Sequence, residues 1–146
     1  MSLSDMGRSA AAGAAFSQPM STVDLTILHV DDDADMRHVT ALCLSGDAGV
    51  RLVSAESGRE ALDLLESGLR PDVIVLDVSM PGMDGPATLS ALRELDGLEA
   101  APVVFLTARS AEHERRRYLA LGAASVIAKP FDPATLADDL RAVARA

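Results

Sequence analysis

The sequence is poor in cysteine and in aromatic residues, and it has no long apolar run. Its single cysteine, Cys43, excludes an internal disulfide and gives no support for a structural zinc site. Aromatic residues make up 3% of a chain that is 49% hydrophobic, so the core must be built from aliphatic side chains. No stretch approaches the roughly 20 apolar residues of a membrane span, and residues 1–19 lack the apolar segment of a secretory signal. We therefore expect a cytoplasmic protein that does not contact a membrane.

Basic residues are also scarce compared with acidic ones. The formal net charge of -9 argues against nucleic-acid binding by this domain and suits bound cations or a partner with a basic face. The 146 residues are enough for one compact domain and too few for two. Residues 1–23 have no periodicity and contain Gly7, Gly13 and Pro19. They predict a flexible N-terminal arm ahead of a single domain at 24–146.

Five short apolar segments alternate with five segments of helical character in the rest of the chain. The apolar segments predict strands at 25–30, 50–55, 71–77, 102–106 and 125–128. The helices that follow them are expected to begin at cap residues, namely Asp33, Ser57 with Glu60, Asp84, Ser110 and Asp132. The first helix, at 34–44, is expected to face the core with the residues at helical spacing, Met36, Val39, Leu42 and Cys43.

This alternation determines the expected architecture. It predicts βαβ units with right-handed crossovers and a single parallel sheet covered on both faces. For five strands connected in this way, the expected strand order is 2-1-3-4-5. The predicted fold class is therefore α/β, a flavodoxin-like (βα)5 doubly wound parallel sheet.

The stretch from Pro71 to Gly85, PDVIVLDVSMPGMDG, is the most informative part of the sequence. Its apolar run ends in Asp77 and is followed at once by turn-forming residues, which is typical of a buried parallel strand. Asp77 would lie at the carboxyl end of that strand, where open α/β sheets bind their ligands. A carboxylate at this place is costly unless its charge is used. We interpret Asp77 as a nucleophile that accepts a phosphoryl group.

Other strands also end in polar residues that suit this chemistry. The first strand is followed by Asp31 and Asp32, the fourth closes at Thr107, and the fifth is followed by Lys129. Two carboxylates about 4 Å apart repel by roughly 4 kcal/mol at an effective dielectric near 20, so three of them favour a bound divalent cation. Oxygen ligands suit Mg²⁺. Lys129 would pair with Asp77 or its phosphate, and Thr107 could donate its hydroxyl to a phosphate oxygen.

Taken singly, these residues have plain structural explanations. The acids after the first strand could form a capped and solvated turn, Thr107 could be a strand-end β-former, and Lys129 could be a solvated charge or a partner of Asp77. Their convergence from four separate strands favours a functional site. His29 is interpreted as a packing residue within the first strand. The Arg115–Arg117 run is either a solvated helix face or a docking patch for an acidic partner.

Four motifs in register give a specific resemblance. They are VDDDADMR after the first strand, LDVSMPGMDG at the third, LTA after the fourth and AKPF after the fifth. With this spacing, the chain from Leu25 to Ala146 resembles the receiver domain of two-component response regulators. The resemblance implies a signalling switch rather than an enzyme. A histidine kinase or a histidine phosphotransfer protein would be its partner on one side, and a downstream protein or a fused output domain on the other.

The resemblance also implies roles for individual residues. Asp77 would take the phosphoryl group, and the phosphoryl-aspartate would later hydrolyse. Mg²⁺ would be held by Asp31, Asp32, Asp77 and the main-chain carbonyl of Ser79. Lys129 would contact the phosphate, and its peptide bond to Pro130 would be cis. Thr107 would be the switch hydroxyl.

One position departs from the pattern of the family. The family often carries Tyr or Phe three residues before the lysine, and here that position is Val126. A valine cannot make the same large swing, so coupling to the face formed by the last two helices and the fifth strand would use backbone shifts or Tyr118. A homodimer through that face is a further expectation.

Three alternative functions are weighed against the switch. An interaction-only pseudo-receiver would lack an acid, the threonine or the lysine, and none is missing. A Mg²⁺-dependent hydrolase of small phosphoesters would need a second acid two residues after the nucleophile, where Ser79 stands. A flavin-binding module would need a hydroxyl-rich phosphate loop in place of the three acids after the first strand.

Overall fold

The computed structural model of the chain describes residues 23–108 and 112–146. Its sheet has five parallel strands in the order β2-β1-β3-β4-β5, which confirms the predicted fold. The strands are β1 (Leu25–Val30), β2 (Val50–Ala55), β3 (Val73–Asp77), β4 (Val103–Thr107) and β5 (Ser125–Ala128). The helices between them are α1 (Ala34–Leu44), α2 (Gly58–Glu66), α3 (Gly85–Leu92), α4 (Glu112–Ala120) and α5 (Leu136–Arg145).

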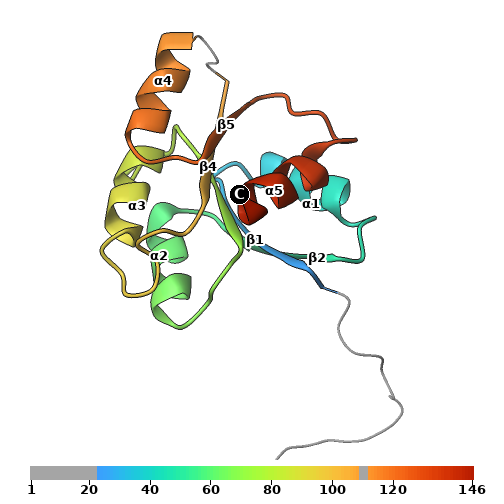
Figure 1. Cartoon of the computed structure of the whole chain (residues 1–146), viewed down its shortest axis with the longest axis horizontal. Helices are drawn as coiled ribbons and strands as arrows, with labels where there is room; N and C mark the ends of the chain where they lie inside the picture. The colour runs from blue at the N-terminus through green and yellow to red at the C-terminus, as the bar shows by residue number, and fades with distance from the viewer. Residues whose placement is uncertain (1–22, 109–111) are drawn as a thin grey trace, which may run out of the picture.

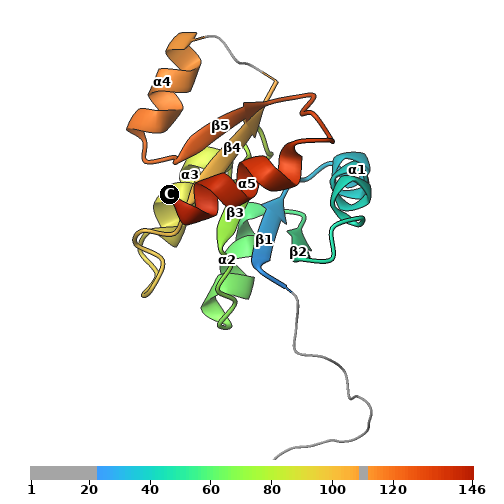
Figure 2. The same ribbon diagram turned by 45° about the vertical axis from the view of Figure 1, so that its right-hand side comes forward.

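Helices cover both faces of the sheet. Figure 1 and Figure 2 show α1 and α5 on one face and α2, α3 and α4 on the other. Successive side chains of a strand point to opposite faces, so β1 contributes to two cores. Ile27 packs on the α1/α5 side, and Leu28 packs on the α2/α3/α4 side. Both cores are largely aliphatic, as the composition predicts, and Phe105 and Tyr118 lie together in the second of them.

Several helix starts follow the predicted caps. The side chain of Asp33 accepts from the backbone N–H of Asp35 at 2.9 Å, and that of Asp84 accepts from Ala87 at 2.9 Å. The hydroxyl of Ser57 accepts from the backbone N–H of Glu60 at 3.0 Å. These bonds satisfy helix N–H groups that have no partner within the helix. The predicted cap Ser110 lies outside the described residues, as does nearly all of the predicted N-terminal arm.

The last helix begins later than predicted. The sequence analysis predicted Asp132 as its cap, but α5 starts at Leu136. The carbonyl of Asp132 accepts from the N–H groups of both Thr135 and Leu136, and its side chain accepts from Ala134 at 2.9 Å. Asp132 therefore closes a tight turn instead of capping the helix directly, so the regular helix begins about one turn later than predicted.

The face of α1 also differs from the prediction. Val39 and Leu42 were expected to face the core, but they are 45% and 61% exposed. The buried residues of α1 are Thr40 and Leu44, so the helix is rotated relative to the apolar pattern. Cys43 is half-buried and packs against the α1/α5-side core. An apolar strip of α1 is therefore open to solvent. Within the described residues, every helix is too short or too polar to cross a bilayer.

Candidate functional site

Four strands bring their polar ends to one edge of the sheet. Asp31 directly follows β1, Asp77 ends β3, Thr107 ends β4, and Lys129 follows β5. The register fixes their neighbourhood, since Val30 lies beside Leu76 and Asp77 beside Leu106. Beyond them, the backbone N–H of Lys129 donates to the carbonyl of Thr107 at 2.8 Å. The predicted convergence follows from the parallel pairing.

The acidic side chains form a compact cluster. One carboxylate oxygen each of Asp31, Asp32 and Asp77 lies within 4.8 Å of the others. Oδ1 of Asp31 accepts from the backbone N–H of Asp33 at 2.9 Å, whereas its buried Oδ2 has no hydrogen-bond partner among the described residues. A buried carboxylate oxygen without a partner is costly. Oxygen donors at this spacing fit a bound cation, which would remove that cost.

Among the described residues, Lys129 supplies the one ammonium group that contacts the cluster. Its Nζ lies 2.9 Å from Oδ1 of Asp77 and 3.8 Å from Oδ2 of Asp31. Three carboxylates against one ammonium leave a negative excess, which again favours a cation. Lys129 is one quarter exposed, whereas the Asp77 side chain is 8% exposed.

Burial dominates the electrostatics of these groups. It raises the pKa of Asp77, and the nearby charge of Asp31 acts in the same direction, while the hydrogen bond from Lys129 opposes both. Burial likewise raises the pKa of Asp31. For Lys129, burial alone would lower the pKa, but the hydrogen bond and the charge of Asp77 outweigh it, so the pKa is raised. Lys129 therefore stays protonated beside the carboxylates.

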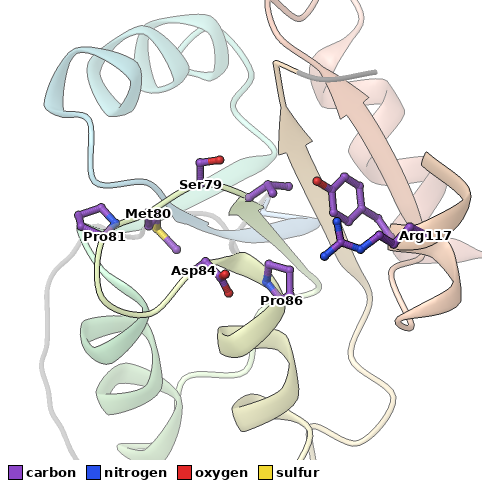
Figure 3. Close-up of a pocket in the computed structure, with 8 residues that line it drawn as sticks. Ser79, Met80, Pro81, Asp84, Pro86 and Arg117 are labelled. Carbon is purple, nitrogen blue, oxygen red and sulfur yellow. The ribbon is translucent and has the colours of Figure 1, made fainter. Parts of the chain in front are cut away.

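The other predicted site residues lie in β4, in and directly after β5, and in the loop after β3. Thr107 is buried at the end of β4, and the Lys129–Pro130 peptide bond is cis. Ser79 is exposed in the loop between β3 and α3, where it lines a cavity of about 570 Å³ that is bounded across from it by Arg117 of α4 (Figure 3). Val126 is buried in β5, directly beside Phe105 of β4.

Sequence reasoning did not identify two residues that shape the loops of the site. The guanidinium of Arg37 donates to the carbonyl of Asp31 at 2.6 Å and ties α1 to the end of β1. A Cβ on Gly85 would lie 2.7 Å from the carbonyl oxygen of Asp77, so the start of α3 can approach β3 only through glycine. The Asp84-Gly85 pair was predicted as a turn, which is the only signal for this close approach.

His29 is a buried neighbour of the acids. It is fully buried in β1, as predicted for a packing residue. Burial lowers the pKa of its imidazole to about 4, so the ring is neutral near pH 7. Its Nε2 lies 3.8 Å from Oδ2 of Asp31, which is too long for a hydrogen bond.

An apolar groove lies on the α1 side of the site. It has a volume of about 390 Å³, and Lys129 forms part of its wall. Met36 and Val39 line it from α1, and Pro130, Phe131 and Pro133 line it from the loop between β5 and α5. It is continuous with the exposed strip of α1. An apolar surface therefore borders a strongly polar site.

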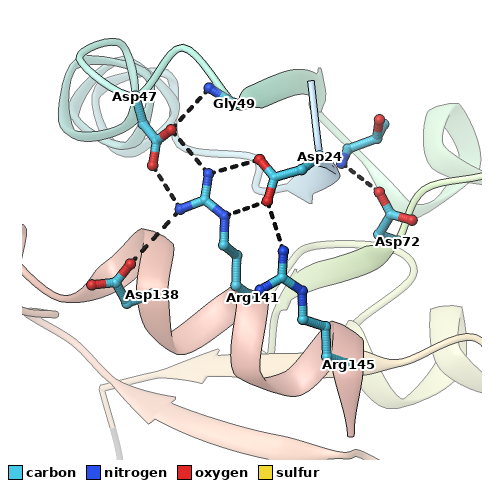
Figure 4. A network of polar contacts seen from close by, with 8 residues as sticks. Asp24, Asp47, Gly49, Asp72, Asp138, Arg141 and Arg145 are labelled. Atoms are coloured by element: carbon cyan, nitrogen blue, oxygen red, sulfur yellow. Dashed lines mark hydrogen bonds and ion pairs between the residues drawn. The ribbon is translucent and has the colours of Figure 1, made fainter. Parts of the chain in front are cut away.

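Figure 4 shows a second polar cluster, absent from the predictions, which includes Asp24 directly before β1, whereas the acidic site lies at the carboxyl ends of the strands. The guanidinium of Arg141 on α5 makes two hydrogen bonds to Asp24 and two to Asp47, at 2.8–3.0 Å. Arg145 donates to Asp24 at 2.9 Å. The hydrogen bonds from Arg141 lower the pKa of both Asp24 and Asp47. This cluster joins the start of β1 and the loop after α1 to the last helix.

Comparison with known proteins agrees with the geometry. The chain is 40% identical over 112 residues to an uncharacterized 14.6 kDa protein of Leptolyngbya boryana, covering 77% of this chain and 84% of that protein. It is 39% identical over 119 residues to the transcriptional regulatory protein CpxR of Escherichia coli, covering 82% of this chain and 49% of that protein. The chain thus spans about half the length of CpxR.

Solved structures and a family description lead to the same result. The chemotaxis protein CheY4 of Vibrio cholerae has a TM-score of 0.74 and 34% identity, covering 82% of this chain and 98% of that one. The description of the response regulator receiver domain matches residues 27–141. Sequence, fold and acidic pocket together show that the chain belongs to the response regulator receiver domain family, a phosphoacceptor switch of two-component signalling and not a conventional enzyme.

Proposed function

We propose that Asp77 is the residue that accepts the phosphoryl group, from a histidine of a kinase or of a histidine phosphotransfer protein. The observation that supports this assignment is the position of Asp77. Its carboxylate ends a central strand, contacts Lys129 at 2.9 Å, and lies within 4.8 Å of Asp31 and Asp32. None of the other acids described near this edge combines these contacts.

The proposed reaction is a transfer between two side chains. An oxygen of the Asp77 carboxylate attacks phosphorus, the P–N bond to the donor imidazole breaks, and the imidazole leaves with the electron pair and takes a proton. Lys129 then exchanges its contact with Asp77 for one with a phosphoryl oxygen. Water later attacks the acyl phosphate and restores the carboxylate with release of inorganic phosphate.

We assign the metal site to Asp31, Asp32 and Asp77, with Mg²⁺ as the ion. Mg²⁺ prefers oxygen ligands and retains several waters, which suits three carboxylates at an edge open to solvent on the side of Asp32. The main-chain carbonyl of Ser79 is the proposed fourth protein ligand. A bound ion would neutralise charge on the transferring group.

The docking site of the phosphodonor is assigned to α1 and the groove beside it. Val39 and Leu42 form an exposed apolar strip, and the groove of about 390 Å³ reaches Lys129, which contacts Asp77. A donor helix that buried its apolar side here would bring a histidine to the acidic edge. Burial of such a strip would supply most of the binding free energy.

The output surface is assigned to α4, β5 and α5. Leu119, near the end of α4, and Leu121, directly after it, are exposed. They suit a downstream protein, a fused output domain or a second copy of this chain in a homodimer. Two observations disfavour other functions. The acids, Thr107 and Lys129 are all present, unlike in a pseudo-receiver, and Ser79 stands where a phosphoester hydrolase would need its second acid.

The test is formation of a covalent adduct. The protein is incubated with Mg²⁺ and acetyl phosphate, and phosphorylation is followed by intact mass and by sensitivity to hydroxylamine, which cleaves acyl phosphates. The wild type should form the adduct and Asp77→Asn should not. Asp84→Asn is the matched control, because Asp84 is an exposed acid of the following loop whose side chain caps α3, and it should retain the adduct. An adduct that persists in Asp77→Asn would assign the acceptor elsewhere.

A further inference from the structure

Helix α4 is attached to the sheet by few contacts. Its sequence, EHERRRYLA, is strongly polar, and among the described residues α4 buries only Tyr118. Besides this ring, Arg115 donates to the backbone carbonyl of Val126 at 2.8 Å. A helix held by one buried side chain can shift at a lower cost than a helix with a full apolar face. The packing of Tyr118 therefore determines where α4 lies.

The ring of Tyr118 packs against the strand that ends in Thr107. Its centroid lies 5.3 Å from that of Phe105, at an interplanar angle of 70°, which is a favourable edge contact. Phe105 precedes Thr107 by two residues, so both side chains lie on the same face of β4. Val126, the neighbour of Phe105 in β5, is aliphatic and provides no aromatic contact here. The aromatic contact of this face thus comes from α4.

Tyr118 is buried, and it also lines a cavity beside the loop that follows Asp77. Tyr118 and Arg117 line the cavity of about 570 Å³ together with the loop residues after β3. Figure 3 shows Ser79, Met80 and Pro81 of that loop across from Arg117. The guanidinium of Arg117 lies 5.7 Å from the Tyr118 ring centroid. Tyr118 therefore contacts Phe105 of β4 and borders a cavity that the loop after the proposed acceptor also lines.

We propose that Tyr118 couples the state of the Asp77 site to the position of α4. This inference rests on the proposed role of Asp77. A phosphoryl group at Asp77 adds oxygen acceptors that draw in Thr107 and the N–H groups of the loop after β3. The end of β4 and the loop after β3, which both border the Tyr118 ring, then change position. The ring moves away from Phe105 toward the cavity, and α4 moves with it because Tyr118 is its one buried side chain among the described residues.

The chain allows a direct test without substitution. Tyr118 is the single tyrosine and the chain contains no tryptophan, so tyrosine emission reports Tyr118 alone. Mg²⁺ with beryllofluoride, a mimic of the phosphoryl group, should change the emission of the wild type and its quenching by acrylamide, with no change in Asp77→Asn. Unchanged emission in a wild-type protein that carries the adduct would overturn the proposal.

Hydrogen exchange separates this proposal from the function on which it rests. In the wild type, beryllofluoride should slow exchange in the loop 78–84 and alter exchange in 112–121. In Tyr118→Leu the loop response should remain and the α4 response should be lost, whereas Tyr118→Phe should retain both, because the ring is kept. Arg116→Ala, an exposed change on the same helix, is the control and should behave as the wild type. No loop response in the wild type would reject the proposed role of Asp77. An α4 response that survives in Tyr118→Leu would reject only the coupling.

Discussion

Lys129 and Asp77 form an ion pair at 2.9 Å although 52 residues separate them in the chain. The pair places the ammonium beside the proposed acceptor before any phosphoryl group arrives. The charge that would stabilise the added phosphate is therefore already in position, and it costs no further ordering of that side chain during the reaction.

Loss of the Lys129 ammonium should slow phosphorylation of Asp77 while the fold is retained. Lys129→Met should slow adduct formation with acetyl phosphate by at least about tenfold, because the transferring group loses its fixed positive partner. Lys129→Arg retains the charge but changes the geometry and should be intermediate. The rate is measured by intact mass over time. A wild-type rate in Lys129→Met would contradict the assigned role.

Lys129 is also the only lysine of the chain, so its ionisation can be measured directly. After reductive methylation with carbon-13 formaldehyde, one lysine resonance can be titrated by NMR. Its pKa should lie above the ordinary lysine value, because Asp77 stabilises the charged form. In Asp77→Asn the pKa should fall, since burial then acts without the hydrogen bond of the carboxylate. A pKa that is unchanged between the two proteins would argue against the ion pair in solution.

Removal of one acid should weaken metal binding. Asp31→Asn should reduce the Mg²⁺ affinity by about tenfold or more, measured by calorimetry, because it removes a charged oxygen ligand from the cluster. Asp63→Asn is the control, since Asp63 is an exposed acid on α2 far from the site in the sequence, and it should leave the affinity unchanged. Equal loss in both variants would indicate a general charge effect.

The raised pKa values of Asp31 and Asp77 predict a pH dependence of stability without metal. Because burial raises these folded-state values above the ordinary value of 3.8, the folded state binds more protons than the unfolded state between the two. These groups therefore favour the folded state at low pH, and that contribution is lost as pH rises through the folded pKa. At pH 7 in EDTA, Asp77→Asn should therefore be more stable than the wild type, because the buried side chain no longer has to ionise. Denaturation in urea should show that the stability difference between Asp77→Asn and the wild type decreases toward pH 4. Addition of Mg²⁺ at pH 7 should also decrease this difference.

The cluster around Arg141 should have the opposite pH dependence. Its hydrogen bonds lower the folded-state pKa of Asp24 and Asp47, so their contribution is present above the ordinary value and is lost as pH falls through the lowered values. Arg141→Ala should lower Tm at pH 7 by on the order of a few degrees. The deficit should disappear at acid pH, where both carboxylates are protonated. Arg51→Ala, an exposed change in β2, should leave Tm near the wild-type value.

A charge placed on the exposed strip of α1 should slow phosphotransfer from the protein donor and leave phosphorylation by a small molecule unchanged. Leu42→Glu should reduce transfer from a cognate phosphotransfer protein by about tenfold or more, because a carboxylate would be buried in the contact. The same variant should react with acetyl phosphate at the wild-type rate. Leu121→Glu, directly after α4, is the matched control and should leave transfer intact. Slower reaction with both donors would indicate damage to the site itself.

Local patterns predicted most elements of the fold closely. The bounds of β1, β2, β5 and α1 agree with the sequence, because each segment carries its own period and its own terminating residues. Asp33 and Asp84 cap their helices as expected, since a cap depends only on groups within three residues. The start of α5 was wrong because Asp132 can close a turn or cap a helix, and local sequence alone does not choose between them.

The sequence by itself determined the parallel sheet and which residues stand at its carboxyl edge, because alternation of apolar and helical segments restricts the connections and parallel strands all end on the same side. The tertiary structure alone decided which face of α1 is left open, how Arg141 joins three distant segments, and that Tyr118 meets Phe105. These are contacts between side chains on separate elements, and they depend on the rotation and offset with which the helices pack on the sheet. No single segment encodes that rotation, since it results from the packing of the whole core.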